Sequence, residues 1–249
     1  MILIRDIRKS FDGNPVLRGV SFDVPDGETL VILGGSGCGK TILLKMIIGL
    51  LSPDSGSIIV DGSDVISMSY PDLQKIRFNF GLLFQSAALF DSLTVGENIA
   101  LALRRTKGLS EQEIANRVRN ALDLVRLERV EHEMPSQLSG GMRKRVGLAR
   151  AIAPNPRYVL YDEPTTGLDI PTADEINLLI RDLRVKLGVT SIVVTHDLHS
   201  AFVVGDRFTI LEGGVAMFAG TRQEIEQSQD ERVRKYVSSS LSTQGTLRP

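Results

Sequence analysis

The sequence predicts an α/β fold, with an antiparallel β subdomain near its beginning and an α-helical subdomain inserted in its middle. Three observations support this prediction. Strand-like apolar runs alternate with helical segments, and Asp-Gly or Gly-Gly turns separate the runs near both ends. Between Gln85 and Pro154 apolar residues recur at helical spacing and strand signals disappear. The predicted strands lie within residues 2–4, 16–24, 29–33, 57–60, 80–84, 157–161, 190–195 and 207–219.

Composition is typical of one intracellular domain. The 249 residues are enough to bury a full core, and 29 basic against 30 acidic residues indicate no general affinity for nucleic acid or anionic lipid. A single cysteine excludes an internal disulfide. The charged start, MILIRDIRKS, does not match a signal peptide, and no stretch approaches the roughly 18 apolar residues of a transmembrane helix. We therefore expect any role at a membrane to come through a partner.

The clearest motif is GGSGCGKT, which matches the phosphate-binding loop pattern G-x-x-x-x-G-K-[ST]. It follows the predicted strand 29–33 and precedes an apolar segment, 42–48, that reads as a helix. A chance glycine turn is the alternative, but strand, loop, Lys-Thr and helix stand in the order that the motif requires. The sequence therefore predicts a phosphate site made of Gly34, Gly35, Ser36, Gly37, Cys38, Gly39, Lys40 and Thr41.

The residue types of this loop suit a nucleotide bound with magnesium. Glycines allow the backbone to curl so that successive N–H groups point inward, and the helix N-terminus adds a partial positive charge. We expect Lys40 to reach the β- and γ-phosphates and the Thr41 hydroxyl to ligate Mg²⁺.

Two carboxylates follow the predicted buried strand 157–161. Asp162 is suited to hold Mg²⁺ through its water shell, and Glu163 is the candidate that polarises the attacking water in phosphoryl transfer. An adjacent acidic pair is usually a solvated turn, and the phosphate loop in the same chain is what favours the functional interpretation.

Three other candidates are weak signals by themselves. His196 ends the predicted strand 190–195 and could contact a γ-phosphate, although a lone histidine is more often a structural donor. Gln85 closes the predicted strand 80–84 and could contact Mg²⁺. Phe11 precedes an Asp-Gly turn and could stack on a base, but an aromatic residue there is as easily part of the core.

A second phosphate-type site is predicted at Ser139-Gly140-Gly141, directly before a predicted helix over residues 143–150. One chain cannot easily bring two helix N-termini to one phosphate. With this segment, the order of motifs (phosphate loop, Gln85, LSGGM, YVLYDEP, TTGLD and VVTHD) resembles the ATPase subunit of an ABC transporter over residues 1 to about 220.

The resemblance implies a P-loop NTPase with a RecA-like core, ATP and Mg²⁺ as ligands, and a head-to-tail homodimer. Ser139 and Gly141 of one chain would then close over the ATP held by the phosphate loop of the other. It further implies specific roles, which are the adenine-stacking aromatic for Phe11, the Q-loop and an Mg²⁺ contact for Gln85, the Walker B pair for Asp162 and Glu163, the D-loop aspartate for Asp169, and the switch histidine for His196.

Shorter phrases are similar to the MlaF-type subunits of bacterial phospholipid transporters, namely GLLFQSAALFDSLTVGENIAL, LSGGMRKRV and DERVRKYV. That resemblance implies an MlaE-like permease, an MCE-domain protein and, in some systems, a STAS-domain protein as partners. It places the chain at the cytoplasmic face of the inner membrane, held by the permease. The alternatives are a transporter ATPase for another cargo, an FtsE-like regulator that moves no cargo and, less favoured because the chain holds one nucleotide site, a soluble ABC protein acting on ribosomes or DNA.

The predicted organisation is an ABC ATPase domain over 1–220 with its helical subdomain at about 86–154, a helical extension over 221–237 and a disordered tail over 238–249. Two residues depart from the family pattern. Ile42 replaces a hydroxyl residue that would contact the α-phosphate, and Ile170 stands where proline is common.

Overall fold

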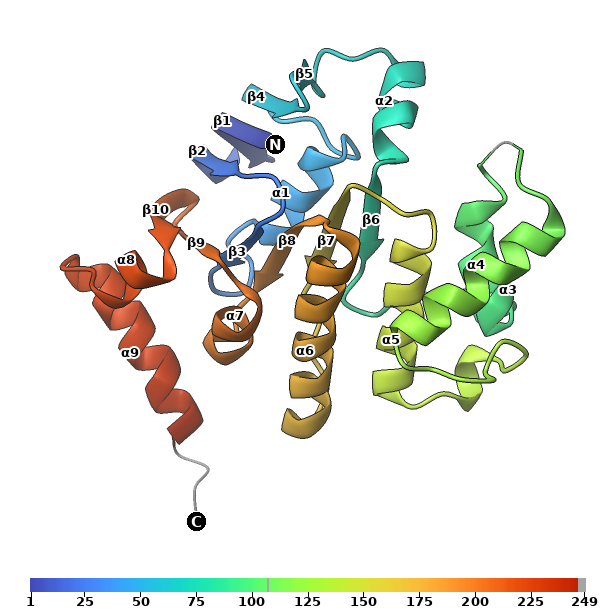
Figure 1. Cartoon of the computed structure of the whole chain (residues 1–249). Helices are drawn as coiled ribbons and strands as arrows, with labels where there is room; N and C mark the ends of the chain where they lie inside the picture. The colour runs from blue at the N-terminus through green and yellow to red at the C-terminus, as the bar shows by residue number, and fades with distance from the viewer. Residues whose placement is uncertain (107, 246–249) are drawn as a thin grey trace. The chain divides into compact units, whose positions relative to one another are not determined.

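The computed structural model describes residues 1–106 and 108–245, and the side chains of residues 239–245 are left aside (Figure 1). The chain divides into two compact units. Unit 1 comprises Met1–Gln74 and Thr190–Pro249, and unit 2 comprises Lys75–Val189. The boundary between the units falls within helix α2 (Tyr70–Arg77), which the sequence analysis did not predict.

An antiparallel sheet forms the first part of unit 1. Its strand order is β2-β1-β4-β5, from β1 (Ile2–Phe11), β2 (Asn14–Val24), β4 (Ser55–Val60) and β5 (Ser63–Asp64). β1 runs to Phe11, further than the predicted 2–4. The extension arises because Asp12 and Gly13, with φ of 49° and 78°, form the left-handed two-residue turn that closes a hairpin. The antiparallel subdomain predicted from the sequence is thus confirmed.

Parallel strands form the second part of unit 1. β3 (Thr29–Leu33) lies between β8 (Thr190–Thr195) and β9 (Arg207–Glu212) and runs parallel to both, while β10 (Val215–Thr221) pairs antiparallel with β9. All five residues of β3 are buried, as expected of a strand covered on both faces. Helices α1 (Lys40–Ile47) and α7 (Leu198–Val204) follow β3 and β8.

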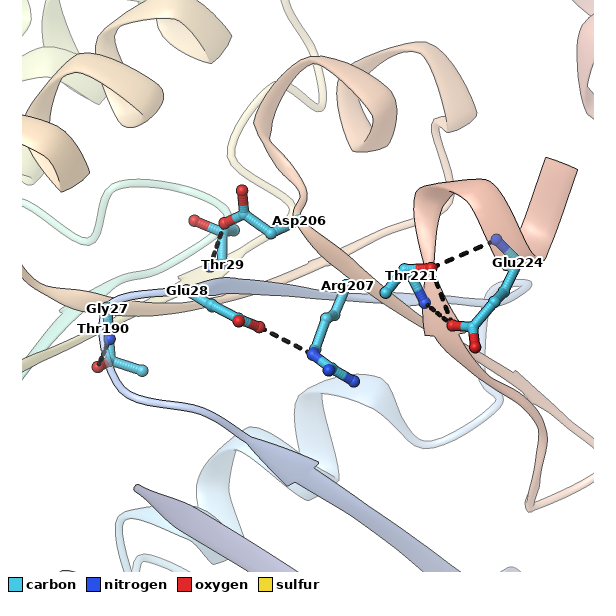
Figure 2. Close-up of polar contacts among 8 residues, drawn as sticks. All are labelled: Gly27, Glu28, Thr29, Thr190, Asp206, Arg207, Thr221 and Glu224. Atoms are coloured by element: carbon cyan, nitrogen blue, oxygen red, sulfur yellow. Dashed lines mark hydrogen bonds and ion pairs between the residues drawn. The ribbon is translucent and has the colours of Figure 1, made fainter.

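Polar contacts join the two sequence segments that make up unit 1, residues 1–74 and 190–249 (Figure 2). The Thr29 amide donates to the Asp206 carboxylate at 2.8 Å, and the Gly27 amide donates to the Thr190 hydroxyl at 2.9 Å. Arg207 pairs with Glu28 at 2.8 Å on the half-exposed surface beside them. These contacts set the start of β3 against the starts of β8 and β9.

Unit 2 contains two parallel strands, β6 (Phe80–Leu83) and β7 (Tyr158–Asp162), together with a group of helices. The helices α3, α4 and α5 pack on one another, and no strand interrupts the described residues between them (Figure 1). Capping boxes begin two of these helices, since Thr94 pairs with Glu97 at α3 and Ser110 with Glu113 at α4. The helices are α3 (Val95–Leu103), α4 (Glu111–Leu124), the 3-10 turn η1 (Pro135–Gln137), α5 (Gly140–Ile152) and α6 (Ile170–Leu187).

The C-terminal segment is helical for longer than the sequence predicted. After α8 (Arg222–Glu226), α9 spans Glu231–Gly245 and so includes 238–245, where disorder was expected. No glycine or proline interrupts this segment before Gly245, so backbone hydrogen bonding continues although the sequence is rich in serine. Residues 246–249 lie outside the described part. Among the helices that the structure describes, none has the length and hydropathy needed to cross a membrane.

Candidate nucleotide-binding site

The phosphate loop connects β3 to α1 in unit 1. Gly37 and Gly39 have φ of 78° and 103°, a left-handed conformation that side chains disfavour, and Gly39 is the N-cap of α1. A Cβ atom on Gly35 or Gly37 would meet nothing within 4 Å, so the outer side of the loop is open. The N-terminus of α1 carries a partial positive charge, which favours an anion at this end of the helix.

Two glycines of the loop are required by close packing. A Cβ atom on Gly34 would lie 2.5 Å from the Leu211 carbonyl oxygen and 2.6 Å from the Cys38 sulfur. A Cβ atom on Gly39 would lie 2.7 Å from a methyl group of Leu17 in β2. The loop therefore packs closely against β9 and β2, and these contacts fix the position of its backbone.

Lys40 is buried at 6% exposure and aims its ammonium group back into the loop. Its Nζ donates to the carbonyl oxygens of Gly34 and Gly35 at 2.8 and 3.0 Å. Ser36 is exposed, while Thr41 and Ile42 are half-buried at the start of α1. The loop therefore surrounds the Lys40 ammonium group with glycine-rich backbone, and such an arrangement is suited to binding phosphate.

His196 lies next to the phosphate loop at the same sheet edge. Leu33 and Thr195 are register partners in the parallel pair β3/β8, so the residues that follow both strands emerge together. The His196 side chain is exposed, whereas the following Asp197 caps α7 by accepting from two backbone amides. His196 is therefore placed toward solvent at the edge of the sheet from which the phosphate loop emerges.

Phe11 ends β1 at the hairpin turn of unit 1. Its ring is 40% exposed, and the Lys9 ammonium lies 5.5 Å from the ring centre. The next strand of this hairpin supplies Leu17, which packs on Gly39 of the phosphate loop. An exposed aromatic face on the same hairpin could stack on a base.

Gln85 and the acidic pair emerge together at one sheet edge of unit 2. Leu83 and Tyr161 are register partners in the parallel pair β6/β7, and Gln85 and Asp162 come just after them. Gln85 is exposed, while Asp162 is buried at 6% exposure. Glu163 adopts a left-handed conformation with φ of 48°, and its carboxylate accepts from the Thr166 hydroxyl at 3.0 Å.

Ser139 is the N-cap of α5, which begins at Gly140 and not at residue 143 as the sequence predicted. Its hydroxyl oxygen accepts from the Met142 amide at 3.2 Å. Gly140 and Gly141 form the first turn, because a serine cap stabilises a helix start that two glycines would otherwise disfavour. A Cβ atom on Gly141 would lie 2.6 Å from a methyl group of Thr172, so this turn packs closely on α6.

Asp169 is the N-cap residue of α6, and both it and Ile170 are exposed. Hydrogen bonding from Thr172 lowers the pKa of the Asp169 carboxyl below its ordinary value. Pro171 stands at the second position of the helix, where its missing N–H costs no hydrogen bond. The displacement of proline by one residue is therefore compatible with a regular helix start.

Lys144 is a residue of the site that the sequence analysis missed. It is 5% exposed, and its Nζ donates to the backbone carbonyls of Gln85 and, at 3.2 Å, Glu163. Burial lowers the pKa of Lys144, and the carboxylates of Asp162 and Glu163 oppose that shift. Lys144 lies between Arg143 and Arg145, and a run of basic residues is usually exposed to solvent, which hides a buried member of the run. The available signal was helical spacing, because Lys144 shares a face with buried Gly141 and Leu148.

Unit 1 thus brings together the phosphate loop and His196, with Phe11 on the adjoining hairpin, and unit 2 brings together Gln85, Asp162 and Glu163. Among the residues that the structure describes, no cluster of three or more histidine, cysteine or acidic side chains could hold a metal alone. The candidate oxygen donors are the Thr41 hydroxyl in unit 1 and, in unit 2, the Gln85 amide and the Asp162 carboxylate, each a donor type that Mg²⁺ accepts.

Residues 17–166 match the family model for the ABC transporter. The chain belongs to this family. The protein described as probable ribonucleotide transport ATP-binding protein mkl of Mycobacterium leprae is 39% identical over 237 residues, which is 95% of this chain and 68% of that protein. The spermidine/putrescine import ATP-binding protein PotA of Thermotoga maritima is 41% identical over 227 residues, which is 91% of this chain but 60% of that protein. This chain therefore spans about two thirds or less of the length of such curated relatives.

Solved structures of ABC proteins show the same fold. A dimeric structure of MJ0796, a bacterial ABC transporter cassette, has a TM-score of 0.82 at 34% identity and covers 89% of this chain and 98% of that one. MJ0796 is also known as a dimer in a post-hydrolysis state bound to ADP and Pi. CbiO1 from Clostridium perfringens, part of the CbiONQ transporter complex, has a TM-score of 0.84 at 31% identity. The match covers 99% of this chain and 97% of that one. The P-loop NTPase fold predicted from the sequence is confirmed.

Membership of the ABC family also establishes the general activity. The family is one of ATP-hydrolysing transporter ATPases, and in two of the similar solved structures the neighbouring protein MJ0796 is a dimer. The individual roles of the site residues, the magnesium ion and the cargo are finer statements, which are taken up below as proposals.

Alkylation of Cys38 is expected to be slower when MgATP is bound to this ABC ATPase. The thiol is half-buried in the phosphate loop, and the positive end of α1 favours the reactive thiolate. Mass spectrometry of the adduct over time, with and without saturating MgATP, measures the effect, and a Cys38→Ser variant gives the background. Labelling that inactivates the protein and is slowed by MgATP is the expected result. Equal labelling rates would contradict a position of Cys38 at the phosphates.

Proposed function

We propose that the chain is the ATP-hydrolysing motor subunit of a membrane transporter, working as a head-to-tail dimer with ATP between the copies. The observation that carries this proposal is a pair of helix N-termini with glycines beside them, since α1 is preceded by the glycine-rich loop and α5 begins with Gly140 and Gly141. One follows Gly39 at α1 in unit 1, and the other follows Ser139 at α5 in unit 2. Each offers the positive helix end that favours an anion.

In this proposal the phosphate loop of one copy holds the nucleotide. The loop amides and the Lys40 ammonium contact the phosphates, and Phe11 stacks on the adenine. His196 contacts the γ-phosphate, which its exposed position after β8 supports. The departure at Ile42 removes one hydroxyl contact to the α-phosphate, while the loop amides supply the other donors.

The Mg²⁺ ion is proposed to bind to Thr41, Gln85 and Asp162 together with the phosphates. When bound, it neutralises charge that develops on the transferred phosphoryl group. Glu163 orients the attacking water and accepts its proton, and the hydrogen bond from Thr166 to the carboxylate fixes its direction.

The second copy completes the site with Ser139, Gly140, Gly141 and Asp169. Ser139 accepts one hydrogen bond as the helix cap, and its O–H proton stays available as a donor to a phosphate oxygen. ATP would then favour the closed dimer, and hydrolysis would allow it to reopen, which moves the attached permease.

Phospholipid is the proposed cargo. The support is the similarity of three phrases in this chain to MlaF-type ATPases, which work with an MlaE-like permease, an MCE-domain protein and, in some systems, a STAS-domain protein. That assignment places the chain at the cytoplasmic face of the inner membrane. The names of the two curated relatives instead indicate ribonucleotides and polyamines as the competing cargoes.

Purification of the chain from membranes with its bound partners tests the cargo. We expect an MlaE-like permease and an MCE-domain protein, and ATP-dependent transfer of labelled phospholipid after reconstitution into vesicles. The same complex with Lys40→Ala is the control without ATP use. A permease of the polyamine, nucleotide or cell-division type, or a complex that hydrolyses ATP without moving lipid, would contradict the phospholipid proposal.

A further inference from the structure

One buried ammonium group in unit 2 joins the segments that follow β6 and β7. Lys144 lies on α5, five residues after the cap Ser139, and donates to the carbonyl oxygens of Gln85 and Glu163. We infer that Lys144 is a positioning residue for ATP hydrolysis, which fixes the backbone of Gln85 and of Glu163 to the helix that begins at Ser139. Lys144 itself contacts neither the nucleotide nor the attacking water.

The backbone of Glu163 needs such support. Its φ of 48° is a left-handed conformation that a glutamate disfavours, so neighbouring contacts must hold it. The carbonyl oxygen accepts from the Lys144 ammonium at 3.2 Å and from the Thr166 amide at 3.3 Å. Without the ammonium, this carbonyl loses the contact from Lys144, and we expect the carboxylate to move with the backbone.

The segment after β6 is held in the same way from the same helix. Ala87 and Ala88 also have left-handed φ values, of 60° and 46°. Arg150 donates to their carbonyl oxygens at 2.6 and 2.7 Å. Together with the bond from Lys144 to Gln85, α5 thus fixes both ends of the segment 85–88, and Lys144 extends this support to Glu163.

The surrounding charges make Lys144 hard to replace. Its ammonium is buried, and the carboxylates of Asp162 and Glu163 are the acidic groups that favour its charged form. An apolar side chain would remove a donor from two part-buried carbonyl oxygens and a positive charge from beside two carboxylates. Because α5 begins at the residue proposed to bind the partner's ATP, Lys144 also couples that contact to the residues proposed to act on the chain's own ATP.

The inference rests on the proposed roles of Gln85 and Glu163. Its test distinguishes a failure of the inference about Lys144 from a failure of those proposed roles. Lys144→Met removes the charge and the hydrogen bonds while keeping a long side chain, and Lys144→Gln is a second variant with donors but no charge. Lys186→Met on α6 is the matched control, because Lys186 is exposed. The full-length protein is used throughout. Titration with ATP counts the functional binding sites, so that kcat refers only to folded protein.

We expect kcat per binding site to fall between about tenfold and a hundredfold in Lys144→Met, the range that misplacement of a reacting group causes. KM for ATP should stay within about threefold, since the phosphate loop is unchanged, and Lys186→Met should match the wild type. A merely structural lysine would reduce the number of binding sites without changing kcat per site.

The inference is overturned if kcat per site stays within about twofold of wild type in whichever of the two variants folds, or if KM changes while kcat does not. Glu163→Gln measured in parallel separates the causes. If Glu163→Gln is inactive and Lys144→Met is fully active, only the role of Lys144 is wrong. If Glu163→Gln remains active, the proposed role of Glu163 is wrong.

Discussion

Replacing Glu163 with glutamine is expected to lower steady-state ATP hydrolysis by about 100-fold or more while leaving ATP binding intact. The amide keeps the size of the side chain and its contact with Thr166, but it cannot accept a proton from water. ATP should therefore bind and remain unhydrolysed, and the ATP-bound dimer should accumulate. Phosphate release measures the rate, and light scattering with and without ATP measures the dimer.

Two further variants make this result specific. Glu128→Gln, an exposed residue of unit 2, should hydrolyse ATP at the wild-type rate. Lys40→Ala should lose nucleotide binding itself, because it removes the cation that the phosphate loop holds against Gly34 and Gly35. Hydrolysis by Glu163→Gln within a few-fold of wild type would remove Glu163 from the proposed role.

Replacing Ser139 with arginine should abolish most hydrolysis while single chains still bind ATP. The arginine would occupy the space before the first turn of α5, where the partner's nucleotide is proposed to bind, and so would prevent closure of the dimer. We expect ATP binding to stay within a few-fold of wild type, because the phosphate loop lies in unit 1. In a Glu163→Gln background, the ATP-dependent dimer should no longer form.

Loss of the helix cap is the competing explanation for a defect in Ser139→Arg. A serine cap contributes about 1 kcal/mol to stability. Ser110→Arg provides the matched control, because Ser110 caps α4 in the same unit and has no proposed contact with nucleotide. Equal losses of activity in Ser110→Arg and Ser139→Arg would show that the cap is the cause. Normal hydrolysis by a Ser139→Arg homodimer would contradict the two-chain site.

The phosphate loop could be predicted from the sequence because its shape depends on neighbours along the chain. Glycines at positions 37 and 39 permit left-handed backbone, and a strand before and a helix after them set the direction of the loop. The strand-end positions of Asp162 and His196 could be predicted for the same reason, since each follows a short apolar run.

The start of α5 shows where local reasoning was wrong. Two glycines have low helix propensity, so the predicted helix began at residue 143. In the structure the Ser139 cap and the close approach of Gly141 to Thr172 stabilise a start at Gly140. Thr172 is 31 residues further along the chain, and local propensity contains no information about that contact.

By itself the sequence determined the α/β class and the phosphate-loop motif, and it predicted the residue types of the proposed site, because these depend on short segments and on chemistry at fixed spacing. Only the tertiary structure decided which segments share a sheet edge and which charges are buried. Strand register brings Gln85 to the end of β7, and packing of α5 makes Lys144, which the sequence analysis did not single out, a buried donor. Such contacts join residues tens of positions apart, and burial and pairing depend on what the fold places beside each residue.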